Sequence, residues 1–222
     1  MNKQKFKLQK QQIPNILTIF RIILVPVIIV FMLVDFGPQI YSLKTETPFY
    51  SVNINLNILL ASIFFIVASI TDAIDGYVAR RMNWVSNFGK FWDPLADKIL
   101  TNSILFCLAS PELNIVPIWI PIIMLIRDIV VDGTRMMSAK NNVVVAANWW
   151  GKAKTINIMI AIIVAFFIGA NKNVVSDAWY WGVQNCLMYT ATILTLVSGG
   201  IYCFKFFSIQ AKIRKDKDLI KS

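Results

Sequence analysis

Residues 72–97 read D-A-I-D-G-Y-V-A-R-R-M-N-W-V-S-N-F-G-K-F-W-D-P-L-A-D and set four aspartates in a fixed frame between apolar segments. Carboxylates are costly near hydrocarbon and usually mark function there. On helices, Asp72 and Asp75 are i, i+3 neighbours and Asp93 and Asp97 are i, i+4 neighbours, so each pair shares one helix face. Four facing carboxylates are tolerable only with cations between them, and oxygen-only ligands suit Mg²⁺ or Mn²⁺.

The composition is that of a protein embedded in a membrane. Of the 222 residues, 57% are hydrophobic and only 15% are charged, which is too apolar for a soluble domain. We expect an all-α polytopic membrane protein in which residues 1–222 form a single domain. Each span has roughly the 20 residues that a bilayer requires. The six predicted spans are 15–36, 54–74, 90–110, 114–137, 151–170 and 178–204.

The basic residues predict the orientation of these spans. All of the 22 Lys and Arg residues except Lys44 and Lys172 fall on one side of the predicted topology. The positive-inside rule makes that side cytoplasmic, together with both termini and the acidic frame. The net charge of +10 is explained by anionic lipid headgroups, so nucleic-acid binding is not required.

Three segments lie outside the predicted spans. Residues 1–13 are basic and could form an amphipathic helix on the membrane surface or a disordered tail. Residues 35–53 contain Gly37, Pro38 and Pro48 and favour a turn-rich connection. The basic tail at 205–222 is expected to be a solvated helix extension or an irregular tail.

Histidine and cysteine narrow the possible chemistry. The chain has no histidine, which excludes a histidine general base, a phosphohistidine intermediate and a histidine metal site. Cys107, Cys186 and Cys203 all fall in predicted spans without metal-site spacing. We interpret them as small apolar packing residues.

The pattern D-x2-D-G-x2-A-R-x8-G-x3-D-x3-D at 72–97 resembles, at every position, the signature of the CDP-alcohol phosphotransferases, integral membrane enzymes of phospholipid synthesis. The resemblance implies that Asp72, Asp75 and Asp93 bind metal, and that Asp97 shares the metal site and acts as the base. It further implies a homodimer and a CDP site that comprises Asp72, Asp75, Gly76, Ala79, Arg80 and Gly89. Two Mg²⁺ or Mn²⁺ ions are expected.

Small residues accompany the aspartates. Gly76 and Ala79 each follow an aspartate by one helical turn, and Gly89 precedes Asp93 by one turn. Small residues in membrane helices allow close approach of a ligand or of another helix. Beside the aspartate frame, we interpret these small residues as leaving room for a nucleotide. Helix packing alone is the alternative interpretation.

A second cluster is basic and predicts a phosphate on the acceptor. Arg127, Arg135, Lys152 and Lys154 fall at the cytoplasmic ends of the fourth and fifth spans. Four cations beside the acidic frame would bind a phosphate group. Positive-inside topology alone is the alternative, but it does not require an arginine inside a span. A buried pairing of Arg127 with Asp128 is plausible.

Within the family, residues 13–27, 127–135 and 151–155 resemble the branch that makes phosphatidylglycerophosphate. This resemblance implies transfer of a phosphatidyl group from CDP-diacylglycerol to glycerol 3-phosphate. Asp128 and Asp132 depart from the expected Glu and Thr or Ser. Inositol phosphate, phosphatidylglycerol and serine are alternative acceptors, although serine carries no phosphate. A cation transporter is a further alternative, but we see neither inverted repeats nor broken helices, and the carboxylates lie near one face of the membrane.

The first span carries three polar residues at its inner end. Asn15, Thr18 and Arg21 are spaced i, i+3, i+6, so they share one helix face and are candidates to line the active site. Asn15 follows Pro14, and a helix N-cap is the competing role for it.

Overall fold

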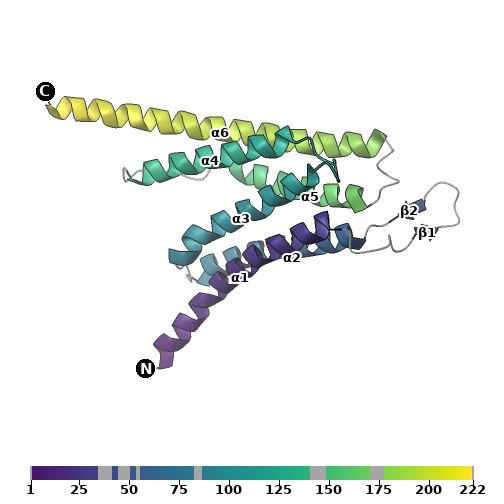
Figure 1. Ribbon diagram of the computed structural model, residues 1–222. Coiled ribbons are helices and arrows are strands. Elements are labelled where there is room, and N and C mark those ends of the chain that lie inside the picture. Colours follow the sequence, from purple (N-terminus) through teal and green to yellow (C-terminus); the bar gives the residue numbers. More distant parts are fainter. Residues whose placement is uncertain are drawn as a thin grey trace. The chain divides into compact units, whose positions relative to one another are not determined.

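Over the residues that it describes, the computed structural model contains six helices and one small hairpin (Figure 1). It describes residues 2–34, 42–44, 51–53, 56–82, 87–140, 149–170 and 178–221. Among the predicted site residues, the side chains of Asp75, Ala79, Arg80 and Lys152 lie outside the described set. Each predicted span coincides with one helix, which confirms the all-α class. The helices are α1 Asn2–Leu33, α2 Leu56–Met82, α3 Asn87–Leu108, α4 Trp119–Lys140, α5 Trp149–Ala170 and α6 Ala178–Lys221.

The hydropathy of these helices fits a membrane protein. Within the described residues, Asn15–Leu33 and Gly182–Ala211 are long and apolar enough to cross a bilayer, and Leu56–Asp72 and Ala153–Ile168 are shorter apolar stretches. Large apolar side chains are also exposed on outer helix faces; Phe204, for example, is 75% exposed. In water such surfaces would be a liability, whereas lipid covers them.

The two terminal helices extend beyond their predicted spans. Helix α1 begins at Asn2 and α6 continues to Lys221, so the basic segments at both ends are helical. The 44 residues of α6 correspond to about 66 Å at 1.5 Å per residue, which is longer than a bilayer is thick. The N-cap role considered for Asn15 is wrong, because Asn15 lies in the interior of α1.

A two-stranded hairpin lies in the connection between α1 and α2. Strands β1 (Ser42–Lys44) and β2 (Ser51–Asn53) pair antiparallel, with Ser42 opposite Asn53. The prediction for residues 35–53 was a turn-rich connection and did not include strands. Three-residue strands leave too little alternation for a pattern to be recognised.

The helices form two compact units. Unit 1 comprises Met1–Ile118 and Ile162–Gln184, and unit 2 comprises Trp119–Ala161 and Asn185–Ser222. In unit 1, α1 packs against α2 and α3 (Figure 1). Its core includes Phe65, whose ring lies 5.7 Å from that of Phe166, and a stacked pair of Phe31 and Phe64 at 5.6 Å.

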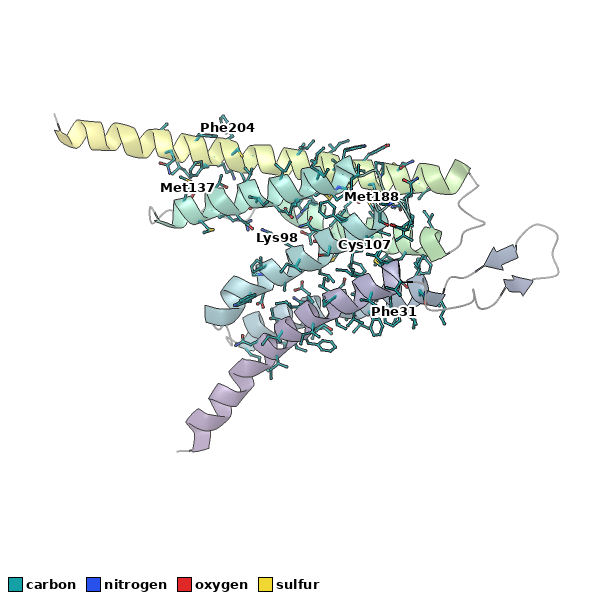
Figure 2. The ribbon with its side chains drawn as sticks, in the orientation of Figure 1. Phe31, Lys98, Cys107, Met137, Met188 and Phe204 are labelled. Carbon is teal, nitrogen blue, oxygen red and sulfur yellow. The ribbon has the colours of Figure 1, made fainter. Side chains whose placement is uncertain are left out.

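In unit 2, α4 and α6 run side by side in the same direction (Figure 1). Trp119 stacks on Tyr189 with ring centroids 5.8 Å apart near the start of α4. Helix α6 presents one face to its neighbours: Met188 is fully buried, whereas Phe204 points away from α4 (Figure 2). The buried face carries polar side chains at Thr192, Thr195 and Ser198.

Candidate functional site

The acidic frame is divided between the end of α2 and the beginning of α3. Asp72, Asp75 and Gly76 lie in the last turns of α2, which ends at Met82, and Gly89, the first member on α3, lies two residues after that helix begins at Asn87. The regular helix on each side gives the aspartate pairs the spacing that the sequence predicts. Pro94 stands between Asp93 and Asp97 inside α3, where a proline cannot donate a backbone hydrogen bond.

Helix α1 contacts both halves of the frame. Thr18 Oγ1 donates a hydrogen bond of 2.5 Å to Asp93 Oδ1, and Arg21 Nη1 lies 2.6 Å from Asp72 Oδ1. Thr18 and Arg21 are both fully buried, while 31% of the Asp72 side chain is exposed. One face of α1 therefore orients a carboxylate on α2 and another on α3.

The described part of the frame is suited to a hard cation by its chemistry. Its ligand candidates are carboxylates, each with two oxygens and about four acceptor sites, so a carboxylate that contacts Thr18 or Arg21 can still bind a metal through its other acceptor sites. Among the described side chains, no three acidic or thiol groups gather at metal-binding range. The side chain of Asp75, the remaining aspartate of the frame, is not among the described side chains. The donor set thus fits Mg²⁺ or Mn²⁺ by residue type.

The basic cluster in unit 2 is built around Asp128. Lys154 Nζ of α5 lies 3.0 Å from Asp128 Oδ1, and Arg127 Nη1 donates to the same oxygen at 2.8 Å. All three side chains are largely buried, with 11%, 12% and 5% exposed for Lys154, Arg127 and Asp128. A charged side chain within a membrane helix is costly, and the pairing with Asp128 offsets part of this cost. Two of the predicted phosphate ligands therefore share one buried carboxylate.

Helix α6 holds the two arginines of α4. Arg127 Nη2 donates to Ser198 Oγ, and Arg135 Nη2 donates to Tyr202 Oη at 2.9 Å. The Arg135 guanidinium also lies 4.9 Å from the centroid of the Tyr202 ring, a cation–π contact. Arg135 is exposed, unlike Arg127. An arginine has five N–H donors, so the exposed Arg135 can bind an anion while it donates to Tyr202.

Comparison with known proteins identifies the family. The model of the CDP-alcohol phosphatidyltransferase family matches residues 11–197. The chain belongs to this family. It is 34% identical over 94% of its length to a protein of Mycoplasma pneumoniae, 93% of which is covered, and 36% identical over 87% of its length to one of Bacillus subtilis, 94% of which is covered. A Rickettsia bellii protein is 32% identical over 89% of the chain and 98% of its own length. All three are named CDP-diacylglycerol–glycerol-3-phosphate 3-phosphatidyltransferase.

Family membership confirms that the chain is a transferase of phospholipid synthesis, as its signature predicted. The predicted roles of individual residues stay predictions. The structure brings Thr18 and Arg21 to the frame, and Arg127 and Lys154 to Asp128, while the side chains of Asp75, Ala79, Arg80 and Lys152 are outside its description. Two contributors were not predicted, namely Ser198 and Tyr202 of α6. Their signal was a pair of polar residues, four positions apart, in an apolar helix.

Proposed function

We propose that the chain transfers the phosphatidyl group of CDP-diacylglycerol to glycerol 3-phosphate, giving phosphatidylglycerophosphate and CMP. The relatives that match almost the whole chain bear the name of this reaction. The observation that carries the choice of acceptor is the basic cluster, in which Arg127, Lys154 and Arg135 gather around one carboxylate and one tyrosine. A phosphorylated acceptor supplies the anion that such a cluster binds.

In the proposed reaction, an acceptor hydroxyl attacks the β-phosphorus of CDP-diacylglycerol in line with the departing CMP. The new P–O bond forms as the pyrophosphate P–O bond breaks, and the hydroxyl proton passes to a base, for which Asp97 is the candidate. Phosphoryl-type transfer depends mainly on positioning and on compensation of charge. A chain without histidine can therefore carry it out.

The four aspartates of the frame, Asp72, Asp75, Asp93 and Asp97, would hold two divalent ions, Mg²⁺ or Mn²⁺. When bound, such ions neutralise phosphate charge and acidify the attacking hydroxyl. Thr18 and Arg21 keep two of these carboxylates in fixed orientations. Gly76, Ala79, Arg80 and Gly89 are the candidates to hold the CDP moiety.

The proposal includes a location. The chain would cross the cell membrane several times with both termini and the acidic frame at the cytoplasmic face, because the basic residues lie on that side. CDP-diacylglycerol would enter from the bilayer and glycerol 3-phosphate from the cytoplasm. Assembly as a homodimer stays a prediction from the family resemblance.

An acceptor panel tests the proposal. Purified protein in detergent, CDP-diacylglycerol and Mg²⁺ would be offered glycerol 3-phosphate, inositol phosphate, phosphatidylglycerol, serine or glycerol while CMP release is followed. We expect glycerol 3-phosphate alone to give fast release, and Asp93→Asn protein to give none. A clear preference for another alcohol would retain the reaction class and replace the acceptor. Equal rates with and without any alcohol would contradict transfer.

A further inference from the structure

Helix α6 forms a surface against which the side chain of Arg127 lies along most of its length. Ser198 is completely buried and accepts a hydrogen bond from Arg127 Nη2. The next residue, Gly199, faces the aliphatic stem of the same arginine. A Cβ atom placed on Gly199 would lie 2.9 Å from Arg127 Cγ, 3.6 Å from Nε and 3.9 Å from Cδ.

The missing side chain at position 199 is what permits this arrangement. Non-bonded carbon atoms prefer separations of about 3.5–4.0 Å, so a methyl group on Gly199 would push the stem of Arg127 away. The clash is with Cγ, close to the backbone, and not with the mobile end of the side chain. Relieving it requires a rotation that carries the guanidinium away from Ser198 and Asp128.

The neighbouring Gly200 provides a contrast. A Cβ on Gly200 would meet no atom within 4 Å. Both glycines line an open cavity of about 280 Å³, so the two positions differ in what an added Cβ would meet and not in their access to this cavity. That cavity is lined mainly by alkyl groups of α4 and α6. Of these two adjacent glycines on α6, an added Cβ would clash with Arg127 at Gly199 and not at Gly200.

The contacts with α6 involve both arginines of α4. Arg127 and Arg135 are eight residues apart, about 12 Å along α4 at 1.5 Å per residue. Their partners Ser198 and Tyr202 are only four residues apart, about 6 Å along α6. One short stretch of α6 therefore holds both guanidinium groups.

We infer that Gly199 and Ser198 are positioning residues, which set the affinity for the acceptor phosphate by holding Arg127 in place. The inference rests on the proposed function, in which Arg127 binds that phosphate. Neither residue touches the substrate itself. A defect in either should therefore appear in the KM for the phosphorylated acceptor and not in the KM for the CDP-linked donor.

The test compares Gly199→Ala with Gly200→Ala. Rates of CMP release would be measured while glycerol 3-phosphate is varied at saturating CDP-diacylglycerol, and then with the roles exchanged. We expect Gly199→Ala to raise the acceptor KM about tenfold or more, the effect of losing a hydrogen bond to a charged group, with the donor KM within twofold. Gly200→Ala should leave both values within twofold. Alanine favours a helix over glycine equally at both positions, so helix propensity cannot explain a difference.

Two further variants keep the result decisive. Ser198→Ala removes only one oxygen atom, so it can replace Gly199→Ala in the test if that variant does not fold. It should shift the acceptor KM in the same direction. In an Arg127→Gln background, Gly199→Ala should add almost nothing, because contacting residues that act together are not additive.

The possible failures are distinguishable. An unchanged acceptor KM in Arg127→Gln alone would overturn the proposed phosphate site, and this inference with it. A raised KM in Arg127→Gln but not in Gly199→Ala or Ser198→Ala would overturn only the positioning role. Equal damage to both substrates in Gly199→Ala would also overturn it, because it would indicate a general packing defect.

Discussion

Thr18 on α1 donates a hydrogen bond to Asp93 on α3, 75 positions along the chain, with a donor–acceptor distance of 2.5 Å. Three residues after Thr18, Arg21 pairs with Asp72 on α2. Residues at i and i+3 share one helix face, so a single face of α1 fixes a carboxylate from each half of the acidic frame. Partners that orient metal-binding side chains tune the metal site, so their loss lowers metal affinity or activity.

Replacement of Thr18 by Val should therefore reduce catalysis while the fold is retained. Valine has almost the shape of threonine but cannot donate to Asp93. Losing a partner that orients a metal ligand typically reduces metal affinity or activity about 10- to 100-fold, so we expect kcat to fall or the Mg²⁺ requirement to rise by that order. Thr18→Ser keeps the hydroxyl and should remain close to wild type. Equal activity of Thr18→Val and wild type in CMP release would show that the hydrogen bond has no catalytic role.

Substitutions in the ion pair of Arg21 and Asp72 should affect the stability of the protein and its activity in different ways. Arg21→Gln removes the buried guanidinium that contacts Asp72, which should destabilise the protein by about 3 kcal/mol at most, because 31% of the Asp72 side chain is exposed. Adding Asp72→Asn should recover part of the thermal stability in detergent, because it removes the carboxylate charge that Arg21 balanced. Activity should stay lost, since Asp72 is a predicted metal ligand. Additive destabilisation in the double variant would contradict direct pairing.

The sequence predicted the helices and the frame because both have strong local signals. Long apolar runs predict membrane helices, and the spacing of Asp72, Asp75, Asp93 and Asp97 is itself a local pattern. Whether α1 extends back to Asn2 was left open, because hydropathy predicts which residues lie in the membrane and not where a helix begins or ends. The hairpin of β1 and β2 was missed because its strands have three residues each.

The contacts between distant elements were harder to predict. A buried pairing of Arg127 and Asp128 could be anticipated, because the two residues are adjacent in an apolar run. The third partner, Lys154, lies 26 positions away, and only helix packing brings it to Asp128. Ser198 and Tyr202 could have been noticed as polar residues within an apolar helix, but nothing local indicates which arginine each contacts.

Loss of a single carboxylate from the frame should abolish CMP release. We expect Asp93→Asn and Asp97→Asn each to insert in the membrane and yet be inactive, because the first removes a predicted metal ligand and the second a predicted base. Chelation of divalent ions should inactivate the wild type, and added Mg²⁺ should restore it. Glu112→Gln is a matched control, because this exposed residue lies in the connection between α3 and α4. Near wild-type turnover in both aspartate variants would place the active site elsewhere.

The predicted topology can be examined by labelling. Single cysteines at positions 2 and 221, in a background with Cys107, Cys186 and Cys203 replaced by Ser, should react with a membrane-impermeant maleimide only after the cells are opened. Cysteines at Lys44 and Lys172, in the connections predicted to be external, should react in intact cells. External labelling at either terminus would contradict an even number of spans with cytoplasmic ends.

Substitutions in the basic cluster should weaken binding of the acceptor and leave the KM for the donor nearly unchanged. Arg135→Gln removes an exposed guanidinium that Tyr202 holds, so it should weaken glycerol 3-phosphate binding without a large loss of stability. A lost charge-assisted contact amounts to about 1.5–3 kcal/mol, or roughly a tenfold to hundredfold rise in the acceptor KM. Lys152→Gln should act in the same direction. Lys154→Gln should also lower stability, because Asp128 loses one of its two buried cations.

Lys205→Gln provides the control for net charge, since Lys205 is exposed on α6 and lies outside the cluster. It should leave both KM values unchanged. Some loss of kcat is expected in Arg135→Gln, because a loosely held acceptor is poorly aligned for attack. If Arg135→Gln and Lys152→Gln raised the KM for CDP-diacylglycerol as much as that for glycerol 3-phosphate, these residues would belong to the donor site or to the fold. Full activity with free glycerol or serine would remove the need for a phosphate pocket, because neither alcohol carries an anion for the arginines to bind.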